Sequence, residues 1–213
     1  MTWENGAAGG LPPGWRRLSL DQLCTSQVGP HLRAEDRTDE RESVPLVLPR
    51  DLAHQRISPA ERVGVVAEKA RALTRHLLRA GDVLIVRTGT VGRCALVTDE
   101  QSGWLCHANL VRLRLDRPDP SLAAYLAGYL SAGFAQDWIH QRSVSSVIPS
   151  VSTRVLGGLP VLLPPLAEQR AIGETLAALD EKVRVHTEIA RATGEYRALL
   201  ADLLMTGALG GEE

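Results

Sequence analysis

The sequence predicts an α+β fold in which one globular module is followed by a long helix of the coiled-coil type. Up to residue 165, short apolar segments bounded by glycine or proline, as in strands, are interspersed with segments of helical period. Residues 167–206 contain no proline and carry apolar residues at steps of four, three and four, the spacing of a coiled-coil seam. We expect four segments: a flexible lead-in at 1–12, a globular module at 13–165, a helical arm at 166–206 and a flexible tail at 207–213.

The composition is that of an ordinary globular protein without an overall excess of basic charge. The chain has 213 residues, 44% of them hydrophobic and 23% charged, a balance that excludes wholesale disorder. The formal net charge is -1, so any binding of nucleic acid must depend on a local patch. Lys69 and Lys182 are the only lysines among 24 basic residues, and the arginines suit bidentate contact with phosphates and guanine edges.

No targeting segment, metal site or catalytic motif is indicated. The first residues lack a signal-peptide pattern and no apolar run reaches about 18 residues, so we expect a soluble, cytoplasmic protein without a membrane segment. Cys24, Cys94 and Cys106 form no C-x-x-C pair, which favours reduced thiols. His107 follows Cys106, but neighbouring strand residues point to opposite faces, so we expect no metal site. Phosphate-binding loops and the motifs of serine hydrolases and zinc proteases are missing, and we expect no catalytic residues.

The first half of the module is expected to contain two strands, an exposed loop and one long helix. Residues 13–24 offer an anchoring Trp15, a short strand and a turn into a small helix. Residues 29–43 are polar and charged without an apolar period, which predicts an exposed loop, and 44–52 form a short strand bounded by prolines. An amphipathic helix is expected over 60–79, from apolar residues at roughly helical spacing: Val63, Val66, Ala70, Leu73 and Leu77.

The second half begins with a hairpin, which is the clearest local pattern of the module. A buried strand at 83–86 and a return strand at 94–97 flank the loop Arg87-Thr88-Gly89-Thr90-Val91-Gly92, which is punctuated by glycine. A further strand is expected over 104–115 and a helix over 121–134. The hydroxyl-rich segment 141–154 then precedes the strand-like sequence LGGLPVLLPP at 156–165.

The arm is expected to be one helix of about 40 residues, or roughly 60 Å at 1.5 Å per residue. A helix of that length cannot bury its apolar stripe on a module of this size, so we expect it to meet another long helix. After Val183 a strict heptad continues weakly through His186, Ala190 and Thr193, whereas a three-residue slip restores an apolar seam. The predicted seam consists of Ile172, Leu176, Leu179, Val183, Ile189, Tyr196, Leu200 and Leu203.

Two clusters of residues are suited to nucleic acid. Between residues 69 and 93 six basic side chains oppose Asp82 alone, and on a helix Arg71, Arg75 and Arg79 would share one face. The adjacent hairpin loop adds a guanidinium, two hydroxyls and a glycine that lets backbone amides approach a phosphate. The second cluster places short donors around one arginine: Gln141, Arg142, Ser143, Ser145 and Ser146. The alternatives are a solvated helix face for the first cluster and an ordinary turn for the second.

Three segments carry a family resemblance. LPPGWRRLSLDQLC, AGDVLIVRTGTVGRCALV and SVIPSVSTRVLGGLPVLLPPLAEQRAI, with the helix that follows, resemble the target recognition domain and helical segment of a type I restriction–modification specificity subunit. The resemblance spans about residues 11–206, and LPPLAEQRAI is its most specific part.

The resemblance implies a subunit without catalytic activity or cofactor of its own. Such a subunit reads one half of a split DNA target in double-stranded DNA and sets the distance between the halves with antiparallel helices. Its partners are two copies of an adenine-N6 methyltransferase that uses S-adenosylmethionine, and often a translocating nuclease driven by ATP with magnesium. By this resemblance, 13–165 is the target recognition domain and 166–206 the spacer and dimerisation arm.

Full-length members have two recognition domains and two helical segments, whereas this sequence has one of each and no internal repeat. The expected form is therefore half-length, with two copies pairing through 167–206 to give a palindromic split target. Pairing with a different half-subunit, which gives an asymmetric target, is the alternative. Two other readings stay open: the detached recognition module of a larger methyltransferase, and a decoy that binds the methyltransferase but not DNA.

The residues expected at the DNA follow from the two clusters. Arg75 and Arg79 are expected to touch phosphates. The expected DNA face comprises Arg87, Thr88, Thr90, Arg93, Arg142, Ser143, Ser145 and Ser146. For the arm, the alternative to a helix–helix seam is packing of Leu176, Leu179, Val183 and Leu200 against the module.

Overall fold

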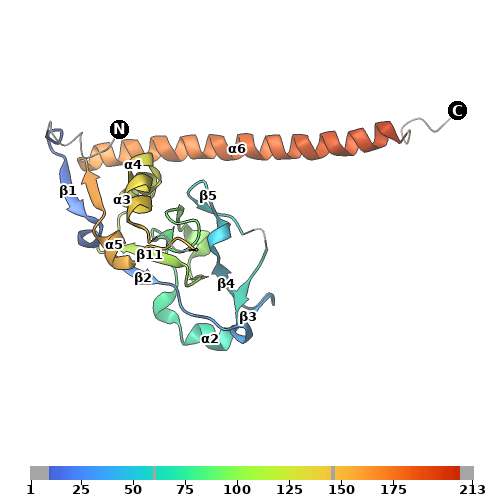
Figure 1. Cartoon of the computed structure of the whole chain (residues 1–213), viewed down its shortest axis with the longest axis horizontal. Helices are drawn as coiled ribbons and strands as arrows, with labels where there is room; N and C mark the ends of the chain where they lie inside the picture. Colours follow the sequence, from blue (N-terminus) through green and yellow to red (C-terminus); the bar gives the residue numbers. More distant parts are fainter. Residues whose placement is uncertain (1–9, 60, 145–146, 207–213) are drawn as a thin grey trace.

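The computed structural model describes residues 10–59, 61–144 and 147–206. Most of the predicted lead-in, the predicted tail and two predicted DNA-facing residues, Ser145 and Ser146, lie outside these described residues. Figure 1 shows a compact body of sheets and short helices from which the long helix α6 extends far to one side. The mixed architecture confirms the predicted α+β class and its C-terminal helix.

A four-stranded sheet in the order β2-β11-β8-β9 forms the centre of the module, and its neighbouring strands are antiparallel. The predicted β8–β9 hairpin is confirmed. All four side chains of β8 are buried, Val83 and Ile85 in one core and Leu84 and Val86 in another, which explains the unbroken apolar run. The strands are β2 (Cys24–Val28), β8 (Val83–Val86), β9 (Cys94–Leu96) and β11 (Leu110–Leu115).

Helices and a two-stranded ribbon cover one face of this sheet. The predicted helix at 121–134 is confirmed as α3 (Pro120–Ser131), which the Asp119 side chain caps by accepting from two backbone amides. Helix α4 (Gly133–Arg142), which follows, was not predicted. The Tyr125 hydroxyl donates to the Leu162 carbonyl at 2.6 Å and ties α3 to the ribbon. The remaining elements on this side are β1 (Arg16–Ser19), η2 (Leu20–Gln22), α5 (Thr153–Gly157) and β12 (Pro160–Leu163).

The opposite face packs against a second layer built from short strands in the order β10-β4-β7-β3. Two expectations are corrected here. Residues 29–43 are not all loop, because β3 pairs with β7, and residues 104–115 form two strands separated by a turn at His107. The layer comprises η3 (Ala34–Asp36), β3 (Arg37–Thr38), β4 (Val44–Val47), η4 (Pro49–Asp51), β7 (Gly64–Val65), η6 (Asp99–Gln101) and β10 (Leu105–Cys106). A separate hairpin of β5 (Leu52–Ala53) and β6 (Arg56–Ile57) lies beside β9.

The prediction of an amphipathic helix over 60–79 is wrong. This segment forms β7, the five-residue helix α2 (Ala67–Arg71) and the 3-10 turn η5 (Thr74–His76). The physical reason lies on β11, where the buried Arg112 guanidinium donates to the Arg75 carbonyl at 3.0 Å and to the Leu77 carbonyl at 3.4 Å. A continuous helix would use these carbonyls internally, so the buried charge favours the broken backbone.

A second arginine of β11 fixes the start of β8. Asp82 is buried, and its two carboxylate oxygens accept from Arg114 at 2.7 and 2.6 Å. The same carboxylate accepts from the Arg79 backbone amide at 2.8 Å. The three hydrogen bonds that the Asp82 carboxylate accepts therefore hold the turn that leads into β8.

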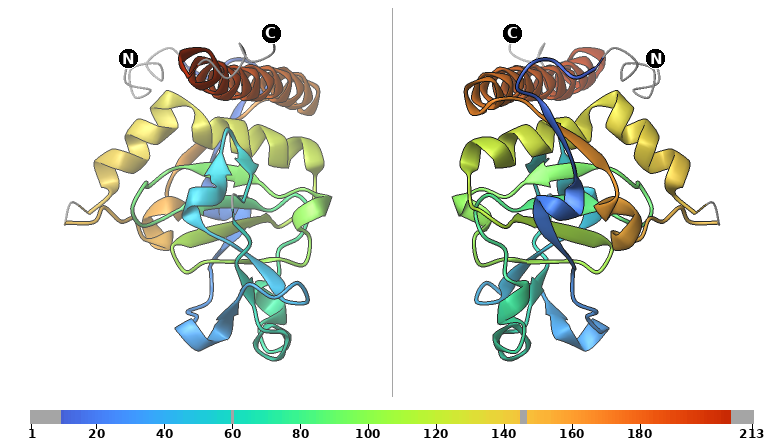
Figure 2. Two further views of the ribbon diagram at one scale, coloured as in Figure 1. Left: turned by 90° about the vertical axis from the view of Figure 1, so that its right-hand side faces the viewer. Right: turned by 90° about the vertical axis from the view of Figure 1, so that its left-hand side faces the viewer.

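The long helix α6 spans Leu166–Met205, 40 residues, which confirms the predicted length. Its first turns lie along α3, and Figures 1 and 2 show α3 between α6 and the central sheet. Gly128 of α3 makes room for Leu176, because a Cβ at Gly128 would lie 2.7 Å from Leu176 Cδ1. The hydrogen bonds and ion pairs described between α6 and the module extend as far as Glu181.

We predict that Asp82→Ala lowers the free energy of unfolding by about 3–5 kcal/mol, because it removes the ion-pair partner of the partly buried Arg114 guanidinium and leaves the Arg79 backbone amide without its acceptor. Urea unfolding followed by circular dichroism would measure this. The matched control is Arg191→Ala, which removes an exposed ion pair with Glu195 on α6 and should change the value by no more than about 0.5 kcal/mol. Equal effects of the two substitutions would contradict the prediction.

Candidate nucleic-acid interface

The loop at residues 87–93, which we call the recognition loop, leaves the buried strand β8 and turns sharply back into β9. Gly89 and Gly92 both adopt left-handed backbone conformations, with φ of 93° and 94°. The Gly92 amide donates to the Val86 carbonyl at 3.0 Å and the Val91 amide to the Gly89 carbonyl at 2.8 Å. The loop is therefore an ordered turn whose outer side chains have defined positions.

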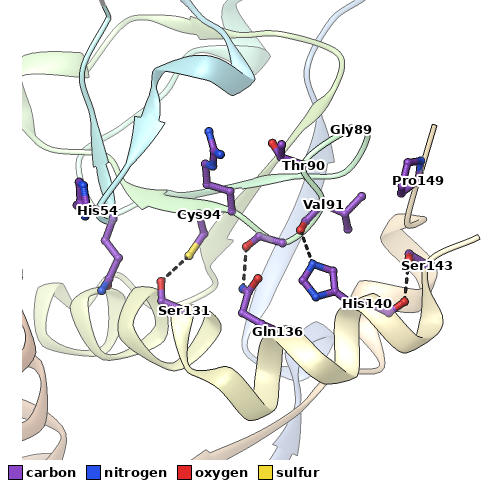
Figure 3. Close-up of a pocket in the computed structure, with 13 residues that line it drawn as sticks. His54, Gly89, Thr90, Val91, Cys94, Ser131, Gln136, His140, Ser143 and Pro149 are labelled. Atoms are coloured by element: carbon purple, nitrogen blue, oxygen red, sulfur yellow. Dashed lines mark hydrogen bonds between the residues drawn. The ribbon is translucent and has the colours of Figure 1, made fainter. Parts of the chain in front are cut away.

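Helix α4 supports the recognition loop from below (Figure 3). The Gln136 side-chain amide donates to the Gly92 carbonyl at 2.9 Å, and His140 Nε2 lies 3.0 Å from the Val91 carbonyl. Because a carbonyl only accepts, this contact places the ring proton of His140 on Nε2. A Cβ at Gly92 would lie 2.5 Å from Gln136 Oε1, so both the backbone angle and the packing require glycine there.

Ser143 of the second predicted cluster, and the segment that follows this cluster, lie beside the recognition loop. The Gly89 amide donates to the Pro149 carbonyl at 3.0 Å, and the Val151 amide donates to the Arg87 carbonyl at 2.9 Å. Thr88 and Ser150 form an isolated β-bridge between the two segments. The structure thus brings together the two clusters that the sequence separates by about fifty positions.

A hollow of about 590 Å³ opens between the recognition loop, α4 and the turn at His54 (Figure 3). Of the described residues that line it, none carries a carboxylate. Burial raises the pKa of the Cys94 thiol in its wall to about 11, so this thiol is protonated at neutral pH. Its polar lining includes His54, Gln55, Thr90, Arg93, His140 and Ser143.

Three of the predicted arginines lie at or beside this hollow. Arg93 is exposed on the recognition loop. The Arg142 guanidinium carbon lies 4.3 Å from the centroid of the Trp138 ring, a cation–π contact that restricts an otherwise exposed side chain. Arg87 is partly buried, and its Nε finds no hydrogen-bond partner among the described residues. The planar guanidinium group of each arginine suits the bidentate binding of phosphates or base edges.

The structure does not place Arg75 and Arg79 with the other predicted residues. Both precede β8, whereas the recognition loop follows it, so they lie toward the opposite end of that strand. The predicted shared helix face with Arg71 is wrong, because α2 ends at Arg71. Arg75 instead donates from Nε to His76, and its carbonyl accepts from the buried Arg112.

The residues of the predicted arm seam differ in their surroundings. Ile172 packs on the module core and Leu176 lies against α3, whereas Leu179 and Val183 are 52% and 46% exposed. Leu200 is partly buried; the others that are exposed are Ile189, Tyr196 and Leu203. On a straight helix, Ile189 lies roughly 120° around the axis from Val183, so the predicted slip turns the apolar stripe part of the way around α6.

Sequence reasoning missed three residues that complete the site: His54, Gln136 and His140. His54 lies at the tip of the β5–β6 hairpin, where only tertiary structure brings it to the hollow. The α4 residues offered no pattern, because Gln136 and His140 acquire their role from carbonyls of a loop more than forty positions earlier. Within the described residues no group of three or more potential metal ligands occurs, and no helix is long and apolar enough to cross a membrane.

The comparison with protein families identifies the chain. A model described as "Type I restriction modification DNA specificity domain" matches residues 12–192. The chain therefore belongs to the family of type I restriction modification DNA specificity domains. A search of the curated proteins gives no match.

Solved structures share this fold. One, from work on complex assembly and conformational transition of a type I R-M system, has a TM-score of 0.62 at 24% identity and covers 91% of this chain and 44% of that one. The HsdS subunit from Thermoanaerobacter tengcongensis has a TM-score of 0.61 at 23% identity, covering 84% and 40%. The type I restriction-modification S subunit from M. genitalium has 0.63 at 17%, covering 90% and 46%. The chain thus spans less than half the length of each of these structures.

We predict that Gly92→Ala destabilises the protein more than Gly89→Ala does. Both replace a glycine of positive φ, at about 1–2 kcal/mol each, but only the Cβ at position 92 meets Gln136. Urea unfolding of both variants, alone and combined with Gln136→Ala, would measure the difference as a double-mutant cycle. The excess should vanish in the Gln136→Ala background, and an excess that persists there would contradict this account of Gly92.

Proposed function

We propose that this chain is a DNA-recognition part of a type I restriction–modification system and reads one half of a split target in double-stranded DNA. The observation that carries the proposal is the joining of the recognition loop to residues 149–151, beside a hollow whose described lining residues carry no carboxylate. Family membership supports the same conclusion. The chain has a formal charge of only -1, so this local arrangement, and not the overall charge, would attract the DNA.

Binding would proceed in two physical steps. Arginines and hydroxyls around the hollow would first neutralise backbone phosphates, a salt-sensitive contribution that carries no sequence information. Side chains of the recognition loop would then read base edges in the major groove, where each bidentate contact gives about 1–3 kcal/mol of discrimination. We assign base reading to Arg87, Thr88, Thr90 and Arg93, and keep Arg142, Ser143, Ser145 and Ser146 as the second side of the DNA face. Arg75 and Arg79 stay candidates for more distant phosphates.

The arm would join this module to a second copy. Large apolar side chains are exposed along α6 outside the part that packs on α3, and Val183, Ile189 and Tyr196 are 46%, 55% and 63% exposed. A long helix in water is stabilised mainly by packing of its apolar face, so these side chains favour a partner helix. We propose that the chain acts as a half-length specificity subunit that pairs with itself through 167–206 and gives a palindromic split target.

Catalysis would be carried out by other subunits of the complex. We propose that the chain is not catalytic and recruits an adenine-N6 methyltransferase, which would bind S-adenosylmethionine. A translocating nuclease that needs ATP and magnesium could join the same complex. This assignment supports a place in the cytoplasm, where DNA and such partners occur.

We predict that Arg93→Ala and Arg142→Ala each weaken DNA binding by about tenfold and that a lost phosphate contact lowers the salt slope by about one. Fluorescence anisotropy with a target-containing duplex at several salt concentrations would measure both. Arg117→Ala is the matched control, because this exposed arginine follows β11 at the end of the sheet away from the recognition loop.

The target itself would come from mapping N6-methyladenine in cells with and without the gene. Loss of one split motif would support the proposal, and a palindromic motif would support self-pairing. Unchanged affinity and salt slope in Arg87→Ala and Arg142→Ala would rule out this surface. Methyltransferase binding without DNA affinity would mark a decoy and overturn the proposed function.

For the arm, we predict a mass in solution of twice the chain mass of 23.1 kDa, and a single-chain mass for Val183→Glu combined with Leu179→Glu. Val185→Glu is the control, because Val185 lies roughly 200° around the helix from Val183. Light scattering after gel filtration would measure the masses. A single-chain mass for the unaltered protein, both alone and with methyltransferase bound, would contradict self-pairing.

A further inference from the structure

The two-residue turn between β5 and β6 makes polar contacts with the arm beyond the part of α6 that packs on α3. We call residues 53–56 the hairpin tip. The Gln55 side-chain amide donates to Asp180 Oδ2 at 2.6 Å, and Arg56 forms an ion pair with Glu181 at 2.8 Å. Figure 2 shows this hairpin, in cyan, reaching toward α3 and α6.

The backbone of the hairpin tip is unusual for its residue types. His54 and Gln55 have φ of 48° and 58°, left-handed values that a two-residue hairpin turn usually assigns to asparagine and glycine. A glycine at position 55 would relieve the strain but would lack the amide that reaches Asp180. Strained backbone that carries a specific contact is a reason to look for a role beyond the turn itself.

The hairpin tip is also tied to the strand that leaves the recognition loop. The Leu96 amide donates to the Gln55 carbonyl at 3.0 Å, and Gln55 forms a β-bridge with Ala95. His54 and Gln55 line the hollow beside the recognition loop. A short series of contacts therefore leads from the recognition loop through β9 and the hairpin tip to Asp180 and Glu181 of α6.

Two separate attachments are needed to fix the direction of a helix. The first is α3, where Gly173 and Leu176 pack, and the second is the hairpin tip a little more than one turn further along α6. Glu181 is itself held by Arg184 at 2.6 Å, and Arg184 also pairs with Glu188 at 2.9 Å. Without the hairpin tip, the arm could pivot about its contact with α3.

The length of the free arm makes small rotations important. From Glu181 to Met205 the helix extends roughly 36 Å, so a tilt of about 5° moves its far end by about 3 Å. This displacement is close to the rise of about 3.4 Å per base pair of DNA.

We infer that Gln55 and Arg56 are positioning residues that fix the angle of α6 on the module and thereby the number of base pairs allowed between the two halves of the target. The effect on the spacing between half-targets rests on the proposed function, whereas the effect on the angle of α6 does not. We assign no base contact to the hairpin tip. It selects spacing by restricting the arm, whereas the recognition loop selects sequence.

The test has two parts, one without DNA and one with DNA. Spin labels on cysteines introduced at Arg117 and Arg197 would report the distance from module to arm, with labelled chains diluted into unlabelled protein. The three native cysteines are buried and should not be labelled in the folded protein. We expect Arg56→Ala combined with Asp180→Ala, which removes both contacts without altering a residue that lines the hollow, to broaden the distance distribution by about 3 Å or more, as a tilt of about 5° would do. Arg56→Lys, which keeps the ion pair, and Arg50→Ala, which removes an exposed pair with Glu61 elsewhere, should leave it narrow.

The second part measures methylation by the complex with methyltransferase. The duplexes carry two half-targets whose spacer has the preferred length or is one base pair shorter or longer. The double variant should methylate adjacent spacers at similar rates while keeping its half-target sequence and its midpoint of unfolding in urea, which a merely structural loss would shift. An unchanged distance distribution overturns the inference, as does broadening with unchanged spacer preference. Failure of the unaltered protein to recognise any split target would overturn the proposed function instead, and the label distances would still decide whether the hairpin tip fixes the arm.

Discussion

The burial of β8 on both faces is the constraint on which the rest of the module depends. Val83 and Ile85 pack under α3 and α4, and Leu84 and Val86 pack under the second layer of strands, so one strand joins both cores. Fully buried side chains of this kind allow little displacement, because interiors are packed as densely as organic crystals. The recognition loop begins at the residue after this strand, and it therefore starts from a strand that is buried on both faces.

The two arginines of β11, one buried and one partly buried, hold the fold together, whereas other arginines of the module are left for binding. Arg112 and Arg114 spend their hydrogen bonds on Asp82 and on the carbonyls of Arg75 and Leu77. Arg93 and Arg142, at the other end of the sheet, remain exposed. Arginine content alone therefore does not indicate a nucleic-acid surface in this chain; the burial of each guanidinium does.

The elements that could be predicted from the sequence are those fixed by local pattern: the β8–β9 hairpin with its glycine loop, α3 and the full length of α6. The prediction of a helix over 60–79 failed because the buried Arg112 guanidinium, which is remote in sequence, donates to carbonyls of that segment that a continuous helix would use internally. For the candidate site, the sequence predicts the loop residues from their composition. It does not predict the contributions of His54 and His140, because each depends on a contact that only the folded chain creates.

The pairing of β1 with β12 has a consequence for how such a module can vary. Arg16 opposite Leu163 brings the entrance and the exit of the module side by side, next to the first residue of α6. Insertions, deletions or exchange of the sequence between these strands would leave the first residue of α6 in place. Apart from α3 and the hairpin tip, on which the arm packs, the architecture separates the part of the chain that can diversify from the part that must keep a fixed length.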